Sequence, residues 1–302
     1  MNGGGPPGFV GAARAGGAAA RASGEGDMPL RPQLDLSFVP SHRGTVIDRR
    51  MFRWPFAISR TFHLDDGPPG LLTVLIQSVS GAITSNDLLL QRFHVAAGAC
   101  VHVGTPSAVS VHRAMPGQGA VDVVELDVAD GGYFEYLPEP RILFPASSLA
   151  QQLRLRIAPG GRALLADAFT AHDPASSGGS FRRFASEIRI ATASDEILAL
   201  DRIDLGGCPQ RSGRRGRYTA FGTLMLVAMG EQGDNDRLRD AFDAQLADVE
   251  GVYWSLSPLP NGAGVALRVS AIDGRWLRLA LSAGHAIFRQ MLSGEAPRPR
   301  VR

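Results

Sequence analysis

Residues 98–146 constrain the fold more than any other stretch, because strand-forming and turn-forming residues alternate there most regularly. Residues 99–105 follow the two-residue period of a β-strand, which puts Cys100 and His102 on the same face. Pro106 ends this strand, since proline has no N–H to give to a neighbouring strand. The stretch therefore opens with a short strand that ends abruptly.

The same alternation continues beyond this strand. Residues 121–128 form a β-branched run, Gly131 and Gly132 turn the chain, and residues 133–137 have the composition of another strand. A short apolar piece follows at residues 142–144, with prolines on both sides. Short strands separated by Gly and Pro predict a mainly β fold.

Strand patterns also occur on both sides of this stretch. The most regular alternation in the chain is at residues 153–157, where one face is apolar and the other polar. The remaining strands are expected at residues 34–38, from residue 44 onward, and at 71–79, 163–165, 184–190, 197–205 and 265–269. An apolar segment at residues 218–229 ends at a glycine.

Two helices are expected near the C-terminus. Leu238, Phe242 and Leu246 recur at helical spacing, which predicts the first helix. The second is expected at residues 275–292, where apolar residues form a stripe despite Gly284. The sequence thus predicts many strands followed by two or so helices.

Composition excludes several classes of protein. The net charge of +2 is too small to favour nucleic acid or an anionic membrane as a partner, and no apolar run approaches the length of a membrane span. The chain contains no lysine, so it lacks the lysine of a phosphate-binding P-loop. Two distant cysteines, Cys100 and Cys208, favour reduced thiols and a cytoplasmic protein over a disulfide scaffold.

The two ends of the chain differ in composition. Residues 1–33 are rich in Gly, Ala, Pro and Arg with few large apolar residues, so they are expected to be a disordered tail. We expect Met28 to be the natural start, which peptide mass mapping of the natural protein would test. Residues 34–295 are expected to form a single β-rich domain.

Four short motifs follow one another in the central stretch, at residues 105–108, 111–114, 134–139 and 142–144. Together they resemble the urease accessory protein family called UreD, or UreH in some species. Members typically read threonine-threonine-proline-glycine-alanine, then tyrosine-arginine-serine, then leucine-glutamate-tryptophan-leucine-proline-glutamine. The order and spacing match here, although several letters differ.

A loop at residues 80–87 matches the family's pattern only in part. Gly81, Ile83 and Asp87 stand where the resemblance requires, whereas three of the family's loop glycines are replaced. Asp87 is interpreted as a brace for this turn or as part of a passage, and Asn86 tolerates a positive φ. The altered loop leaves a diverged paralogue as an alternative.

The resemblance implies a fold and a function. It implies β-strands wound into a layered, helix-like coil of sheets, with helices added late. It also implies a non-enzymatic scaffold that binds apo-urease, a UreF-type accessory protein and, through it, a UreG-type GTPase. It implies no tightly bound cofactor, nickel in transit through an internal tunnel, and an accessory complex that can form a dimer.

The residues themselves offer one candidate metal site and one candidate passage. Cys100 and His102 share a strand face, and His112 lies on a nearby segment; thiolate and imidazole suit nickel or zinc. The plainer alternative is ordinary core and surface residues. Glu135 and Glu139 are interpreted either as lining a polar passage for a cation or as a solvated strand edge.

A Gly-rich loop carries four arginines that either face solvent or dock an acidic partner surface. They are Arg211, Arg214, Arg215 and Arg217.

No GxSxG, HExxH, GxGxxG or Cys-rich zinc pattern is present, which weakens the prediction of an enzyme. Two alternatives to the scaffold remain. One is a metal-dependent hydrolase around Cys100, His102 and His112, and the other is a β-rich binding module without a metal role.

Overall fold

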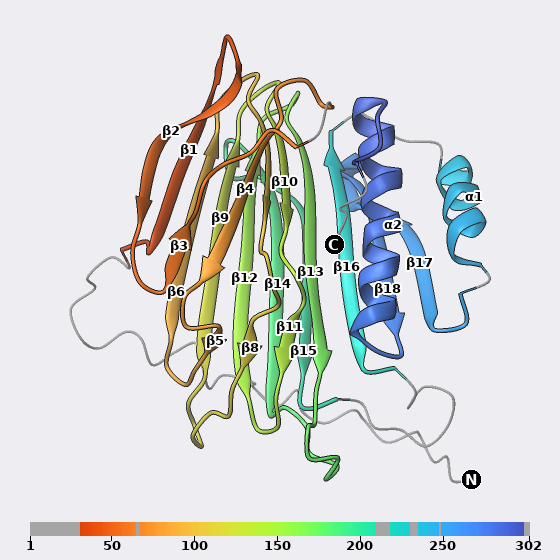
Figure 1. Cartoon of the computed structure of the whole chain (residues 1–302). Helices are drawn as coiled ribbons and strands as arrows, with labels where there is room; N and C mark the ends of the chain where they lie inside the picture. Colours follow the sequence, from red (N-terminus) through yellow and green to blue (C-terminus); the bar gives the residue numbers. More distant parts are fainter. Residues whose placement is uncertain (1–30, 65–66, 209–217, 230–234, 248, 299–302) are drawn as a thin grey trace, which may run out of the picture. The chain divides into compact units, whose positions relative to one another are not determined.

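A computed structural model describes residues 31–64, 67–208, 218–229, 235–247 and 249–298 (Figure 1). Residues 32–302 form one compact unit. The expected disordered tail, apart from residues 31–33, and the expected start at Met28 lie outside the described residues. Among the described helices, none is long and apolar enough to cross a lipid bilayer.

The first sheet has seven strands in the order β15-β14-β12-β9-β6-β1-β2. Its central strands β6, β9, β12 and β14 run parallel, and antiparallel strands β2 and β15 close its two ends. The strands are β1 (Leu34–Ser41), β2 (Gly44–Phe52), β6 (Leu88–Val95), β9 (Ala120–Val128), β12 (Ser148–Ile157), β14 (Arg183–Thr192) and β15 (Ile197–Leu205).

The second sheet has eleven strands, eight of them in the order β17-β18-β16-β13-β10-β7-β4-β3. Strands β4, β7, β10 and β13 are parallel, and three short strands, β5, β8 and β11, extend the ladder beside them. The main strands are β3 (Phe56–Ile58), β4 (Leu72–Ser78), β7 (Cys100–Gly104), β10 (Tyr133–Leu137), β13 (Arg162–Ala171), β16 (Ala220–Ala228), β17 (Val252–Pro258) and β18 (Gly264–Ala271). The short strands are β5 (Ala82–Ile83), β8 (Ser110–Val111) and β11 (Arg141–Leu143).

Consecutive strands wind between the two sheets as a β-solenoid. Strand β9 belongs to the first sheet and β10 to the second, although only the turn at Gly131 and Gly132 separates them. The turns of successive coils stack on one another, because Ala129 N–H donates to the Val95 carbonyl and Ala158 N–H donates to the Val128 carbonyl. The β-helix-like fold implied by the resemblance is therefore confirmed.

Two helices cover the second sheet on the face away from the first sheet (Figure 1). They are α1 (Asn235–Leu246) and α2 (Gly274–Ser293), and a 3₁₀ turn lies between β17 and β18 at Pro260–Gly262. Helix α2 begins where Asp273 accepts hydrogen bonds from the N–H groups of Arg275 and Trp276, and ends at Gly294 with a φ of 77°. Both helices lie where the sequence predicts them.

The second sheet is buried on both faces, so it separates two hydrophobic cores. In β13, Ala163 and Leu165 face the core between the sheets, whereas Leu164 and Ala166 face the core under the helices. Such two-sided burial explains why this strand is apolar without alternation. Strand β17 was not predicted, although its alternating face formed by Val252, Trp254 and Leu256 packs on the helical core.

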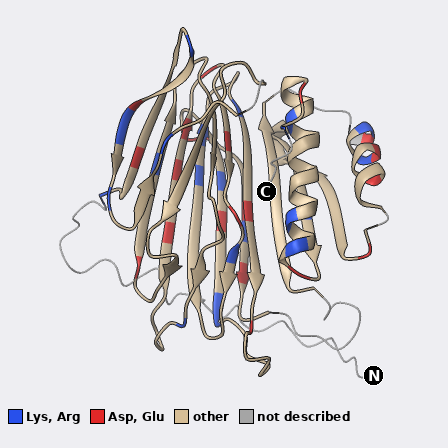
Figure 2. Cartoon of the chain, in the orientation of Figure 1, with Lys and Arg blue, Asp and Glu red and all other residues tan. Residues whose placement is uncertain are grey.

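The outer face of the first sheet carries charged side chains instead of helices. Neighbouring strands there place opposite charges side by side, as Figure 2 shows for the long parallel strands. Arg92 donates to Glu125 at 2.7 Å, and His94 and Arg156 both contact Asp127. Such exposed pairs keep this face polar and contribute little to stability.

Candidate functional site

A fully buried carboxylate lies at the centre of the second sheet. Glu135 on β10 is 0% exposed and points, with Tyr133, toward the helices, because alternate residues of a strand share a face. The parallel register places His102 of β7 directly beside Glu135. A solvated strand edge, the plainer interpretation of Glu135 from sequence, is therefore wrong.

Helix α2 supplies the rest of the group. His285 and Arg289 are one helical turn apart, so both side chains extend from the same face of α2 toward Glu135. Gly284 allows this close approach, since a Cβ there would lie 2.7 Å from Leu267 Cδ2 and 3.0 Å from Leu224 Cδ2. The glycine that interrupts the apolar stripe is thus what lets the helix approach the sheet.

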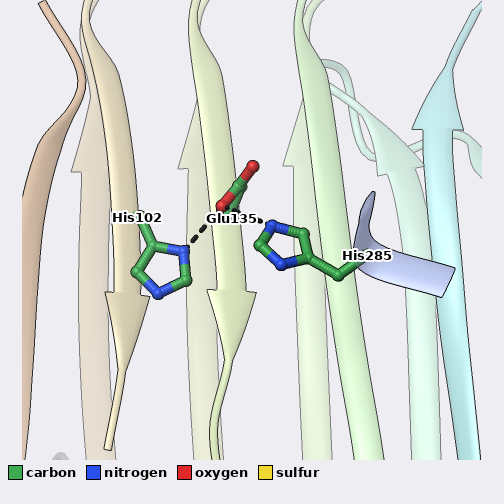
Figure 3. Close-up of side chains that lie close together, drawn as sticks. All are labelled: His102, Glu135 and His285. Carbon is green, nitrogen blue, oxygen red and sulfur yellow. Dashed lines mark hydrogen bonds and ion pairs between the residues drawn. The ribbon is translucent and has the colours of Figure 1, made fainter. Parts of the chain in front are cut away.

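Both oxygens of Glu135 accept hydrogen bonds, and Figure 3 shows the two imidazoles that contact Oε2. Oε2 accepts from His102 Nδ1 at 2.6 Å, from His285 Nε2 at 3.1 Å and from Arg289 Nη2 at 2.6 Å. Oε1 accepts from Arg289 Nε at 2.7 Å and from the Tyr133 hydroxyl at 2.6 Å. One carboxylate therefore ties β7, β10 and α2 together.

The charges of these neighbours decide the protonation state of Glu135. Burial by itself raises the pKa of the carboxyl, but His285, His102 and Arg289 hold the pKa of Glu135 well below its usual range. Burial and the adjacent Glu135 charge raise the pKa of the Tyr133 hydroxyl, so it remains a donor. Glu135 is consequently an ionised carboxylate in a buried position.

The same geometry has the donor set of a metal site. Among the described residues, His102, Glu135 and His285 are the one group of three ligand-type residues whose ligand atoms all lie within 4.8 Å of one another. Two imidazoles and one carboxylate suit borderline divalent cations such as nickel or zinc. Arg289 already supplies a positive charge there, so any such ion competes with a guanidinium.

Comparison with known proteins gives this geometry a context. The family model described as UreD urease accessory protein matches residues 31–302. The chain belongs to the UreD family. It is 43% identical over 265 residues to urease accessory protein UreD 2 of a Bradyrhizobium species (strain BTAi1), covering 87% of this chain and 91% of that protein.

More distant UreD proteins match over similar lengths. Urease accessory protein UreD 1 of Pseudomonas syringae pv. syringae is 36% identical over 259 residues, which is 85% of this chain and 90% of that protein. UreD 1 of the same Bradyrhizobium strain is 34% identical over 253 residues, covering 83% of this chain and 88% of that protein. This chain is thus more similar to UreD 2 than to UreD 1 of that strain.

The predicted cysteine and histidine ligands of this UreD chain do not all converge. Cys100 lies on the same face of β7 as His102, yet the thiol is half-buried and burial raises its pKa. His112 is exposed at the end of β8, where its ring stacks on Phe144 with centroids 5.2 Å apart. Neither Cys100 nor His112 belongs to the group around Glu135.

The remaining predicted residues have structural contacts or lie outside the description. Glu139 accepts from Arg278 Nε of α2 at 2.8 Å, so α2 also contacts the end of β10. Asp87 braces the altered loop by accepting from the N–H and the hydroxyl of Thr84, next to Asn86 with a φ of 67°. The arginines predicted to dock a partner, Arg211, Arg214, Arg215 and Arg217, lie outside the described residues.

Sequence reasoning missed the two helical partners of Glu135. His285 and Arg289 lie in a helix that was interpreted through its apolar stripe alone, although Arg289 is only 1% exposed. The signal was a polar pair at four-residue spacing inside an otherwise apolar segment. Arg289 is separated from Glu135 by 154 positions, so no local pattern links the two.

A second polar group lies between the two sheets. Asp122 accepts from Arg141 Nη2 at 2.5 Å, and Asp167 accepts from Ser186 Oγ at 2.5 Å and from Gln151. Burial raises the pKa of Asp167 despite these hydrogen bonds. The core between the sheets is therefore not uniformly apolar.

Proposed function

We propose that this chain assists the maturation of urease as a non-catalytic scaffold during assembly of the nickel centre. The family match across residues 31–302 carries this proposal, because it spans the whole folded unit and not a single motif. The relatives that bear the name urease accessory protein align over about nine-tenths of their own length. UreD accessory proteins are not enzymes, which fits a chain without a recognised catalytic motif.

The absence of a P-loop lysine and the large area of the two sheets support the choice of partners. We propose that it binds apo-urease and a UreF-type protein, and through the latter a UreG-type GTPase, within a dimeric accessory complex. Because the chain has no lysine, it has no P-loop of its own, so the energy of GTP hydrolysis must come from the partner. Specific complexes commonly bury about 1,200–2,000 Å², and the two large sheets offer faces of ample extent.

We propose that nickel is cargo of this chain and does not remain on it. The polar group between the sheets supports a route for a cation, since Gln151 is in register with Asp122 on one side and with Ser186 on the other. Asp167 reaches the same row from the opposite sheet. Carboxylate, amide and hydroxyl side chains on neighbouring strands thus lie side by side across three coils.

Deletion of the gene tests the scaffold proposal. We expect the deletion strain to produce urease polypeptide with little activity and little nickel, and the wild-type gene to restore both. Urease would be purified from each strain, and its activity and nickel content measured together. Fully active, nickel-loaded urease in the deletion strain would overturn the proposal.

The hydrolase alternative depended on Cys100, His102 and His112 acting together. Their failure to converge removes the geometric reason for it, because a hydrolytic metal needs three ligands on one ion. Hydrolysis of a small substrate by the purified chain would revive it.

A further inference from the structure

Two imidazole nitrogens and one carboxylate oxygen lie within 4.8 Å of one another beneath α2. His102 Nδ1 and His285 Nε2 both contact Glu135 Oε2, at 2.6 and 3.1 Å, and the two rings lie 5.8 Å apart at an interplanar angle of 28°. Ligands about 2.1 Å from one ion are roughly 3 Å from each other. The two nitrogen–oxygen distances already match this spacing, so a bound cation would require only that the two nitrogens, now within 4.8 Å of each other, approach to a similar distance.

We propose that His102, Glu135 and His285 form a low-affinity site for a divalent cation, and that Arg289 takes the cation's place when no ion is bound. The inference deepens the proposed role in nickel delivery and rests on it. The site replaces Cys100 and His112 by Glu135 and His285 as the partners of His102. On binding, metal–nitrogen bonds replace the two N–H bonds that point at Glu135, and each proton leaves to solvent or moves to the other ring nitrogen.

Glu135 is arranged so that its two oxygens have separate tasks. Oε1 accepts hydrogen bonds from the Tyr133 hydroxyl and from Arg289 Nε, and these two bonds fix the orientation of the carboxylate. Oε2 faces both imidazoles and receives the second Arg289 contact, from Nη2. A bound ion would replace the two imidazole contacts and the Nη2 contact at Oε2, whereas the hydrogen bonds at Oε1 remain and orient the ligand, as outer-shell partners do in metal sites.

Arg289 makes the site weak, and weak binding suits an ion in transit. A dication and a guanidinium in one buried site repel each other, and the low dielectric strengthens that repulsion. His285 provides the approach from outside, since its side chain is 17% exposed whereas that of Arg289 is only 1% exposed. An ion can thus reach the group without removal of the helix.

Nickel binding to matched variants tests the site. In His102→Asn/His285→Gln the amide nitrogens replace Nδ1 and Nε2 as donors to Glu135, so the hydrogen bonds remain while the metal ligands are lost. His94→Asn is the matched control, because His94 Nδ1 contacts Asp127 on the exposed face. Titration of the full purified chain with nickel chloride should show affinity at least about tenfold weaker in the double variant than in the control. Equal affinity in both would overturn the proposal.

A measurement on the unaltered chain avoids any doubt about folding of the variants. Paramagnetic nickel should broaden the imidazole NMR signals of His102 and His285 before those of His94. Broadening of the His94 signal first, or of all histidine signals together, would contradict the proposed site.

The Arg289→Gln variant tests whether the guanidinium competes with the ion. It should raise nickel affinity by about tenfold or more, since it removes the competing charge. Unchanged or weaker nickel binding would reject the proposal that Arg289 competes with the ion.

The test of the metal site and the test of the scaffold proposal can fail independently of each other. If the double variant loses nickel affinity in vitro but still activates urease in cells, the cluster binds nickel and the delivery route lies elsewhere. If the deletion strain makes normal urease while the cluster still binds nickel, the scaffold proposal fails and the metal site stands.

Discussion

Two buried carboxylates in this molecule lie in opposite electrostatic surroundings. Glu135, under helix α2, faces a guanidinium and two imidazoles, and its pKa is held well below the usual range. Asp167, between the two sheets, accepts from the neutral side chains of Gln151 and Ser186, and burial raises its pKa. Burial is the largest influence in both cases, so the direction of the shift depends on the neighbours that oppose it: His285, His102 and Arg289 outweigh burial at Glu135, whereas two neutral donors and the charge of Arg141 do not outweigh it at Asp167.

The largest expected effect is the loss of the Glu135 charge. Glu135→Gln removes the carboxylate that faces the buried Arg289 guanidinium, and breaking one buried ion pair typically costs about 3–5 kcal/mol. We expect the free energy of unfolding at pH 7, from urea titration, to fall by that amount. A loss below about 1 kcal/mol would mean that the cluster is no more stabilising than an exposed pair.

A smaller effect should appear in the acid limb of the stability curve. Because the folded-state pKa of Glu135 is below its unfolded value of about 4.3, its contribution is complete above that pH and is lost as pH falls toward the folded pKa. The wild-type chain should therefore lose stability more steeply below about pH 4 than Glu135→Gln does. Urea titrations of both proteins across this range provide the check, and parallel curves would contradict the assigned shift.

The smallest effect is expected at Asp167. Its raised pKa means that ionisation opposes folding at neutral pH, and this cost disappears as pH falls. Asp167→Asn keeps an acceptor for Gln151 and a partner for the Ser186 hydroxyl, so stability at pH 7 should change by no more than about 1 kcal/mol. A loss as large as that of Glu135→Gln would show that the charge of Asp167 is needed for folding.

The sequence predicted most strands and both helices, because each depends on a local pattern. It did not predict which sheet each strand joins, since the pairing of β9 with β6 and β12 depends on how the chain winds. A signal for the winding was present. Three turns that carry the chain from the first sheet to the second share the order Ala, any residue, Gly, at residues 96–98, 129–131 and 158–160.

The candidate site was predicted only in its strand residues. His102 and Glu135 were both identified, but from separate arguments, and their contact follows from the parallel register of β7 and β10. His285 and Arg289 enter the site through tertiary packing of α2 around Gly284, which no periodicity in the strands can indicate. Long-range contacts of this kind are what a single sequence conveys least.

The pairing of Glu135 with Arg289 also sets an order of events during synthesis. A chain growing from its N-terminus places β10 in position long before residue 289 leaves the ribosome, because 154 positions separate the two partners. Until then the carboxylate has no guanidinium to neutralise it, and water is its better solvent. The face of the second sheet that carries Glu135 is therefore expected to stay open to water until α2 packs against it.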